Sequence, residues 1–316
     1  MLFDMNRKDG GPHPSWRDLP DVPRWRRRPE AGVPPEFVMP PGLQAAVNAA
    51  LLLRRPLLLT GPTGSGKSTL VELLAARLGL GEVLRWHITS KTTLNDGLFT
   101  YDALDRLHEI RLGNEGDRVE RFVRLGPLGT ALASPDRPRA VLVDEIDKSD
   151  IDLPGDLLNV LENFEFEIPP LLRALRPQGA GGPEGFWVKG ADRQADIFYD
   201  VGDGKVRAAH YPVVVFTSNR ERSFAPAFLR RCVRFTMPPI TPELLGEIVA
   251  KHLHQGADVE RAAIGEFAER IHAGEELAIN QILELVYLVT GRNSEYIGGE
   301  DRQELARILL SELNAQ

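Results

Sequence analysis

The sequence predicts an α/β domain, in which a parallel sheet is flanked by helices, followed by a small all-α domain. Short apolar runs alternate with helical stretches up to about residue 239, as is typical of a parallel sheet. The runs "LLLT" and "VLVD" are apolar almost throughout, which is expected of strands buried on both faces. Beyond Pro239 the pattern is helical throughout, so we expect a domain boundary there.

The elements of this fold can be assigned in order along the chain. Residues 1–35 are rich in Pro, Gly and Arg and are expected to form an extended arm. We expect strands at 57–60, 82–88, 140–147 and 212–218, and helices at 40–56, 65–79, 126–133 and 153–163. The tripeptide Gly-Asp-Gly at 202–204 predicts a hairpin turn, so residues 164–211 should contain an inserted hairpin.

Composition restricts the class of protein. The net charge of −7 argues against general coating of nucleic acid, which needs a local excess of Lys and Arg. The single cysteine excludes a disulfide framework and fits a reducing cytoplasm. No apolar run reaches the ~18 residues of a membrane span, and the first residues lack the apolar core of a signal peptide. The basic run at 24–28 could contact phosphates, although a solvated tail is the simpler interpretation.

Residues 61–69, "GPTGSGKST", match the phosphate-loop pattern G-x-x-x-x-G-K-[ST] between a predicted strand and a predicted helix. Glycines let such a loop curl, so that backbone N–H groups surround phosphate oxygens at the start of the helix. We expect Lys67 to reach the β- and γ-phosphates and Ser68 to bind Mg²⁺. The residues expected to contact the nucleotide are Gly61, Pro62, Thr63, Gly64, Ser65, Gly66, Lys67, Ser68 and Thr69.

Acidic and amide side chains follow two other predicted strands. Asp144 and Glu145 end the run "VLVDEID", at the edge of the sheet where α/β proteins bind ligands. We expect Asp144 to hold Mg²⁺ through water and Glu145 to polarise an attacking water. Asn219 could hydrogen-bond that water or the γ-phosphate, the alternative being a turn residue. Asp147 and Asp150 are expected to be solvated or to cap a helix.

Two adjacent arginines, Arg230 and Arg231, stand in an otherwise apolar stretch. In a core they would need partners, so they are expected to point outward, toward a negative group or into a surface ion pair. The neighbouring Cys232 is interpreted as a small buried side chain rather than a nucleophile. Trp86 and Trp187 could pack in a core or a loop, and the seven histidines lack metal-ligand spacing.

Taken in order, the phosphate loop, "VLVDEID", "TSN" and "AFLRRC" resemble an AAA+ ATPase of the P-loop NTPase fold. The resemblance implies Mg²⁺-dependent ATP hydrolysis at the subunit interfaces of a ring, a hexamer in this superfamily. It also implies that an arginine of "LRR" reaches the nucleotide of the neighbouring subunit, with Arg231 preferred over Arg230. ATP rather than GTP follows from the family, since no N-K-x-D guanine signature is present.

The stretches "GPLGTAL", "DEIDKSDIDLPGDLLNVLENFEFEIP" and "AFLRRCVRF" are similar to the MoxR branch of that superfamily. The resemblance implies an AAA+ domain at 36–239 with inserts at about 97–124 and 164–211, and a helical lid at 240–316. It further implies a chaperone-like role on an unknown client protein, for which an adhesion-type metal-dependent protein is the family analogy. The basic "sensor 2" residue of the lid is not matched, because residues 274–291 contain no Lys or Arg.

Two other functions remain open at this point. A slowly hydrolysing, nucleotide-gated scaffold would suit the missing lid arginine. A nucleic-acid motor would use the basic run and the inserts as contacts. A small-molecule kinase fits least, because it has no use for an arginine supplied by a second subunit.

Overall fold

A computed structural model of the 316-residue chain describes the region that carries the predicted motifs. The described residues are 22–23, 32–113, 118–175, 185–193, 196–239, 241, 244–248, 265, 283–284 and 287–288. Most of the predicted arm (1–35) and of the predicted lid (240–316), including the basic run at 24–28, lie outside the described residues. These domain assignments therefore stay predictions.

Five parallel strands form the central sheet, in the spatial order β11-β1-β10-β5-β2. They are β1 (Leu57–Thr60), β2 (Leu84–His87), β5 (Ala140–Asp144), β10 (Val213–Ser218) and β11 (Val233–Thr236). Because every pairing is parallel, the carboxyl ends of all five strands meet at one edge of the sheet. The strands that precede the phosphate loop, the carboxylate pair and Asn219 are neighbours in this sheet, so the three motifs lie at the same edge.

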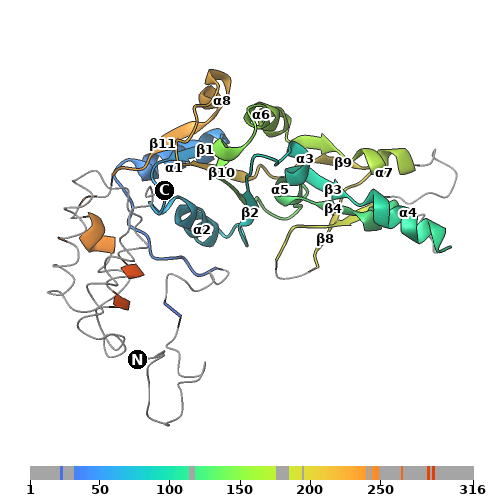
Figure 1. The fold of residues 1–316 in the computed structure, drawn as a ribbon, viewed down its shortest axis with the longest axis horizontal. Coiled ribbons are helices and arrows are strands. Elements are labelled where there is room, and N and C mark those ends of the chain that lie inside the picture. The colour runs from blue at the N-terminus through green and yellow to red at the C-terminus, as the bar shows by residue number, and fades with distance from the viewer. Residues whose placement is uncertain are drawn as a thin grey trace, which may run out of the picture.

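Helices cover both faces of this sheet (Figure 1). Successive side chains of a strand point to opposite faces, so Leu57 and Leu59 pack with one set of helices while Leu58 packs on the other face. The first face is covered by α1 (Leu43–Leu53) and α2 (Lys67–Leu78). The second is covered by α5 (Pro127–Leu132), α6 (Leu153–Asn163) and α8 (Pro226–Arg231). The result is the expected three-layer α/β arrangement.

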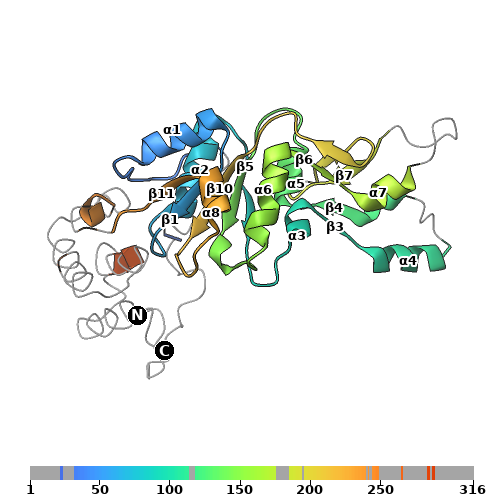
Figure 2. The same cartoon turned by 90° about the horizontal axis from the view of Figure 1, so that it is seen from above.

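The two inserted regions form a second lobe beside the central sheet (Figures 1 and 2). Its sheet has the order β3-β4-β7-β8, with a separate pair β6-β9. The strands are β3 (Phe99–Tyr101), β4 (Val123–Leu125), β6 (Glu165–Glu167), β7 (Trp187–Lys189), β8 (Phe198–Asp200) and β9 (Lys205–Arg207). The helices of this lobe are α3 (Leu94–Leu98), α4 (Ala103–Arg111) and α7 (Pro169–Ala174), and a 3₁₀ turn lies at Val119–Phe122. A second 3₁₀ turn, Ile146–Lys148, follows β5 in the central domain. Since β4 of the first insert pairs with β7 of the second, the two inserts are one structural unit.

The predicted elements of the central domain are confirmed to within a few residues, and the departures are informative. The hairpin predicted within 164–211 is present as the antiparallel pair β7–β8. The Gly-Asp-Gly turn at 202–204 also exists, but the prediction that the hairpin turns there is wrong, because the strands on either side of it, β8 and β9, pair with β7 and β6 and not with each other. Strand β11 was not predicted. Trp86 is buried in the core, whereas Trp187 lies on β7 and is 60% exposed.

A buried polar network joins the second insert to the base of β5. The Arg139 guanidinium donates to Asp192 Oδ1 (2.9 Å), Tyr199 Oη (3.0 Å) and the Glu82 carbonyl (3.2 Å), and the Tyr199 hydroxyl donates to Asp192 Oδ2 (2.8 Å). The Arg139 and Asp192 side chains are almost fully buried. Burial, with a further contribution from Asp192, raises the pKa of Tyr199 to about 12. The network thus anchors the loop between β7 and β8 on the central domain.

Asp192→Ala is expected to destabilise the fold by about 3–5 kcal/mol, because it leaves the Arg139 guanidinium buried without its counter-charge. Urea unfolding followed by far-ultraviolet circular dichroism measures this loss. The matched control is Asp196→Ala, which removes an exposed carboxylate of the same hairpin that pairs with Lys189 (2.5 Å) and should cost less than about 1 kcal/mol. Equal losses for the two variants would contradict an anchoring role for the buried network.

Candidate functional site

The phosphate loop connects the end of β1 to the start of α2, and two of its glycines have no substitute. Gly61 has φ 152°, and a Cβ there would lie 2.8 Å from Cβ of Met237. Gly66 caps α2 with φ 84°, and a Cβ there would lie 3.0 Å from a ring atom of Phe37. Positive φ and the close neighbours together require glycine at both positions. The loop is therefore shaped as the motif predicted, with the amino end of α2 facing the edge of the sheet.

Lys67 is the single cationic residue of the loop and is buried, at 7% exposed. Its ammonium donates three hydrogen bonds, to the carbonyls of Gly61 (2.8 Å) and Pro62 (2.7 Å) and to Oδ1 of Asn219 (2.9 Å). Burial lowers the pKa of Lys67, while the carboxylates of Asp144, Asp147 and Glu145 act in the opposite direction. Lys67 thus connects the phosphate loop to the end of β10, and its ammonium lies at the carboxyl edge of the sheet.

The predicted Mg²⁺ ligands, Ser68 and Asp144, lie together. Ser68 Oγ is 3.4 Å from Asp144 Oδ1, and the buried Thr217 hydroxyl donates to the same oxygen at 2.5 Å. Hydroxyl and carboxylate oxygens are the hard ligands that Mg²⁺ prefers, so this donor set fits the ion. In the part of the chain that the structure describes, no three His, Cys, Asp or Glu side chains are grouped to hold a metal. A Mg²⁺ ion here would therefore take its remaining ligands from phosphate and water.

Glu145 lies directly after β5 and faces Asn219 from the neighbouring strand. Its backbone is in the left-handed region (φ 60°), and its N–H donates to Thr217 Oγ1 (2.9 Å). One carboxylate oxygen accepts from Asn219 Nδ2 (3.4 Å), and the other accepts from Lys148 Nζ (2.9 Å) and lies 3.7 Å from His87 Nε2. An unusual backbone conformation held by several contacts is typical of functional sites. The structure thus brings together the carboxylate and the amide predicted to act on one water.

Asp147 and Thr217 also lie in this site, a position that their local sequence did not predict. The expectation that Asp147 is solvated or caps a helix is wrong, because its side chain is 4% exposed and accepts from the backbone N–H groups of Asn219 (2.9 Å) and Glu221 (3.0 Å). Asp150, by contrast, is exposed as expected. Thr217 could have been predicted as a site residue, because it is a polar residue near the end of an apolar strand. No feature of the local sequence predicts a role for Asp147.

The two arginines end α8, far from the phosphate loop of their own chain. Val233, just after them, pairs with Leu57 at the start of β1, whereas the phosphate loop follows the end of that strand. A four-residue strand spans about 13 Å. Arg231 is paired with Glu162 on α6 and also donates to the Ala227 carbonyl (3.4 Å). Arg230 is exposed and has no hydrogen-bond or ion-pair partner among the described residues.

Cys232 is buried at the end of α8, as predicted. Burial raises the pKa of its thiol to about 12, so it is protonated at neutral pH. A protonated, enclosed thiol is a poor nucleophile, which agrees with its interpretation as a packing residue.

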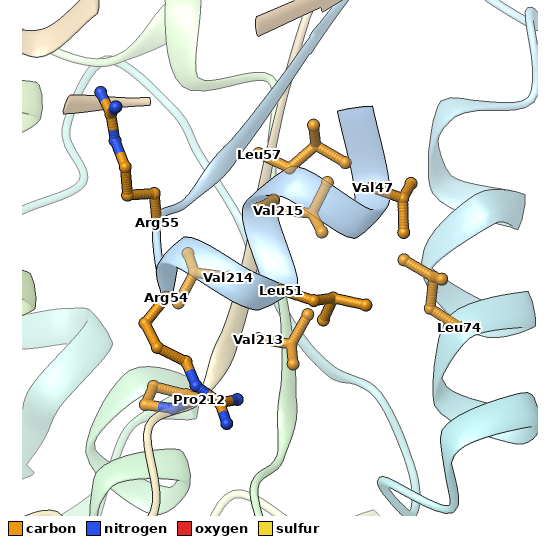
Figure 3. A pocket seen from close by; sticks show the side chains of 11 residues that line it. Val47, Leu51, Arg54, Arg55, Leu57, Leu74, Pro212, Val213, Val214 and Val215 are labelled. Carbon is orange, nitrogen blue, oxygen red and sulfur yellow. The ribbon is translucent and has the colours of Figure 1, made fainter. Parts of the chain in front are cut away.

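A small hollow lies at the opposite edge of the central sheet (Figure 3). It measures about 350 Å³ including the part open to solvent, and is lined by apolar side chains of α1, β1 and β10 together with Arg54 and Arg55. The hollow lies at the amino ends of the strands. Because the polar groups described above gather at the carboxyl ends, the phosphate loop rather than the hollow marks the functional site.

The parallel sheet, the phosphate loop and the carboxylate pair at one edge define a nucleotide-binding protein of the P-loop NTPase class. Within that class, the profile of the AAA domain family, dynein-related subfamily, matches residues 56–232, more than half of the chain. The chain therefore belongs to the AAA domain family. The matched segment runs from the residue before β1 to Cys232, so it includes every predicted site residue.

Similar proteins cover this chain only in part. Midasin from Dictyostelium discoideum is 30% identical over 120 residues, which are 38% of this chain and 2% of midasin. NtrX from Brucella abortus, solved in complex with ATP, has a TM-score of 0.43 at 15% identity and covers 79% of this chain and 49% of its own. The RuvB Holliday junction branch migration motor from Thermotoga maritima has a TM-score of 0.43 at 16% identity, covering 84% and 66%. Likeness at this level does not extend to substrate or partner.

No helix in the described residues is both long enough and apolar enough to cross a membrane.

Proposed function

We propose that this protein hydrolyses Mg²⁺–ATP at the interfaces of a ring-shaped homo-oligomer. The observation that carries the proposal is the convergence of Lys67, Asp144, Glu145 and Asn219 at one edge of the sheet. Direct hydrogen bonds join Lys67 to Asn219 and Asn219 to Glu145, and Thr217 bridges β10 to Asp144. Three adjacent parallel strands thus contribute to a single cluster of side chains, and each strand contributes a group that phosphoryl transfer to water requires.

In the proposed mechanism, the backbone N–H groups of the phosphate loop bind the phosphates, and Lys67 exchanges its carbonyl partners for phosphate oxygens. Ser68 and Asp144 would hold Mg²⁺, which when bound neutralises charge on the phosphates. Glu145 accepts a hydrogen bond from the attacking water, and the Asn219 amide orients that water. Positioning and electrostatic stabilisation account for most catalysis of this reaction, without a covalent intermediate.

The position of α8 supports a contribution from a neighbouring subunit. Arg230 and Arg231 lie at the amino end of β1, a strand length away from their own phosphate loop. An arginine at that distance cannot reach a nucleotide bound in its own chain, but it can reach one bound by an adjacent copy. Because Arg231 already pairs with Glu162 and Arg230 does not pair within the described residues, Arg230 is the more available of the two. An exposed ion pair is weak, so Arg231 stays a candidate.

We assign the biological role to remodelling or assembly of a partner protein, in the manner of the MoxR-like branch. The motif resemblance supports the branch, and the lobe built from both inserts offers a surface outside the ATPase core. The client, the hexameric state and a cytoplasmic location are parts of the same proposal.

The test of ATP hydrolysis is Glu145→Gln, which keeps the shape of the side chain but removes the base. Turnover is expected to fall by about 10²- to 10⁴-fold, the usual contribution of a general base. Affinity for ATP should change by no more than about threefold, because Glu145 has no place in ground-state phosphate binding. Phosphate release gives turnover, and a fluorescent ATP analogue gives affinity.

The matched control is Glu221→Gln, which alters an exposed carboxylate close to the site and should leave turnover unchanged. If the unmodified protein binds ATP yet hydrolyses it no faster than Glu145→Gln, the nucleotide-gated scaffold is the correct function. Mass measurement with and without ATP tests the ring. Capture of a protein by the Glu145→Gln variant in ATP would identify the client.

A further inference from the structure

We infer that Asp147 is a positioning residue, which sets the orientation of the Asn219 amide during ATP hydrolysis. The inference rests on the proposed function and adds a residue to it. Asp147 lies in the short 3₁₀ turn Ile146–Lys148, two residues after Glu145 and on a different strand connection from Asn219. It therefore links the segment that supplies the base to the segment that supplies the amide.

The link is a pair of hydrogen bonds to one carboxylate oxygen. Asp147 Oδ2 accepts from the N–H of Asn219 (2.9 Å) and from the N–H of Glu221 (3.0 Å). Between these residues, Arg220 has φ 68°, a conformation that residues other than glycine rarely adopt. The Arg220 N–H donates to Ser218 Oγ (3.0 Å), which completes the turn. A buried carboxylate that receives two N–H groups from a strained turn holds that turn in one conformation.

The conformation of this turn decides where the Asn219 side chain points. In the structure its Oδ1 accepts from Lys67 (2.9 Å) and its Nδ2 donates to Glu145 (3.4 Å), so the amide bridges the two side chains with its oxygen toward Lys67. A shift of about 1 Å in a positioning group can cost about 100-fold in rate. Loss of the two N–H contacts would allow such a shift, although Asp147 itself need not touch ATP.

The second carboxylate oxygen makes a sharp test possible. Oδ1 of Asp147 is buried and has no hydrogen-bond partner among the described residues. In Asp147→Asn, the amide oxygen can take the place of Oδ2 while the NH₂ group takes the unpaired position. Both N–H contacts are then kept and the negative charge is lost, while the new NH₂ group lies where Oδ1 has no hydrogen-bond partner among the described residues. In Asp147→Ala both the contacts and the charge are lost.

We expect Asp147→Ala to lower kcat about 10- to 100-fold while affinity for a fluorescent ATP analogue changes less than about threefold. Asp147→Asn should recover kcat to within about threefold of the unmodified protein. Asp150→Ala removes an exposed carboxylate three residues away and is the matched control, with kcat unchanged. A merely structural role predicts instead that affinity and kcat fall together, and that outcome, or an inactive Asp147→Asn, overturns the inference. If Asp147→Ala does not fold, Asp147→Ser provides the same comparison.

A double-mutant cycle with Asn219→Ala tests whether Asp147 acts through Asn219. If it does, Asp147→Ala should lower kcat no further once Asn219 is already alanine, because the group it positions is gone. Multiplicative losses would show that the two residues act independently and would overturn the inference. Failure of the proposed function is recognised separately, since the unmodified protein would then show no turnover above Glu145→Gln.

Discussion

Lys67→Met is expected to abolish binding of Mg²⁺–ATP. The substitution keeps the length and apolar stem of the side chain but removes the buried ammonium that joins Gly61, Pro62 and Asn219. Without it, the phosphate loop has no positive side chain to compensate the charge of the β- and γ-phosphates. The affinity for ATP should therefore fall more than about 100-fold. Turnover at subsaturating ATP should fall at least as much.

Thermal unfolding with and without ATP measures this effect without an activity assay. A ligand present at 100 times its dissociation constant stabilises a protein by about 2.7 kcal/mol, which for a chain of this size raises Tm by roughly 4 °C. We expect that rise in the unmodified protein, in Glu145→Gln and in the exposed-lysine control Lys91→Met, and none in Lys67→Met. If ATP raises the Tm of Lys67→Met as much as that of the unmodified protein, the phosphate loop is not the ATP-binding site.

The combined variant Arg230→Ala/Arg231→Ala is expected to bind ATP normally but to hydrolyse it about 10³- to 10⁵-fold more slowly. That is the range of rate enhancement that an arginine supplied by a neighbouring subunit provides, because it stabilises charge that develops only in the transition state. The single variants assign the effect. If Arg230 is the arginine that reaches across, Arg230→Ala should reproduce the combined loss, while Arg231→Ala mainly breaks the pair with Glu162. Arg234→Ala, on the exposed side of β11, is the control.

A mixing experiment tests whether Arg230 and Arg231 act on ATP bound by a neighbouring subunit or on ATP bound by their own chain. The arginine-free variant keeps an intact phosphate loop and Glu145, and Glu145→Gln keeps both arginines. In mixed rings, a Glu145→Gln subunit can supply the arginines to the intact pocket of an arginine-free subunit. Equimolar mixing should therefore restore turnover that neither variant has alone. No recovery in a mixture shown by mass to contain both chains in one oligomer would mean that each chain hydrolyses ATP without its neighbour's arginines.

Local sequence was sufficient for the parts of the site that one segment builds alone. Residues 61–69 contain their own turn, their own glycines and the amino end of their own helix, so the phosphate loop could be predicted without the rest of the fold. The same holds for four of the five central strands, because an apolar run of only four to eight residues between turn residues is typical of a strand buried on both faces. The position of Asn219 at the same sheet edge as the phosphate loop was also predicted, whereas its direct hydrogen bond with Lys67 was seen only in the structure.

Contacts between distant segments were not predictable in this way. Nothing near Asp147 indicates that its carboxylate will meet N–H groups more than seventy residues away. The Gly-Asp-Gly turn predicted that the two strands on either side of it pair with each other. Instead, β8 pairs with β7 and β9 pairs with β6. Arg139 and Asp192 likewise meet only because the hairpin folds back onto the base of β5.

By itself, then, the sequence determined the class of the protein, four of the five strands of its central sheet and the position of its phosphate-loop motif. Those properties depend on interactions within about fifteen residues, where chain connectivity keeps the groups together. Only the tertiary structure decided which carboxylate holds the Asn219 turn, which arginine is engaged in its own chain and how the two inserts combine. Each of these depends on which segments become neighbours when the core is buried, a choice made by the packing of the whole domain rather than by any local pattern.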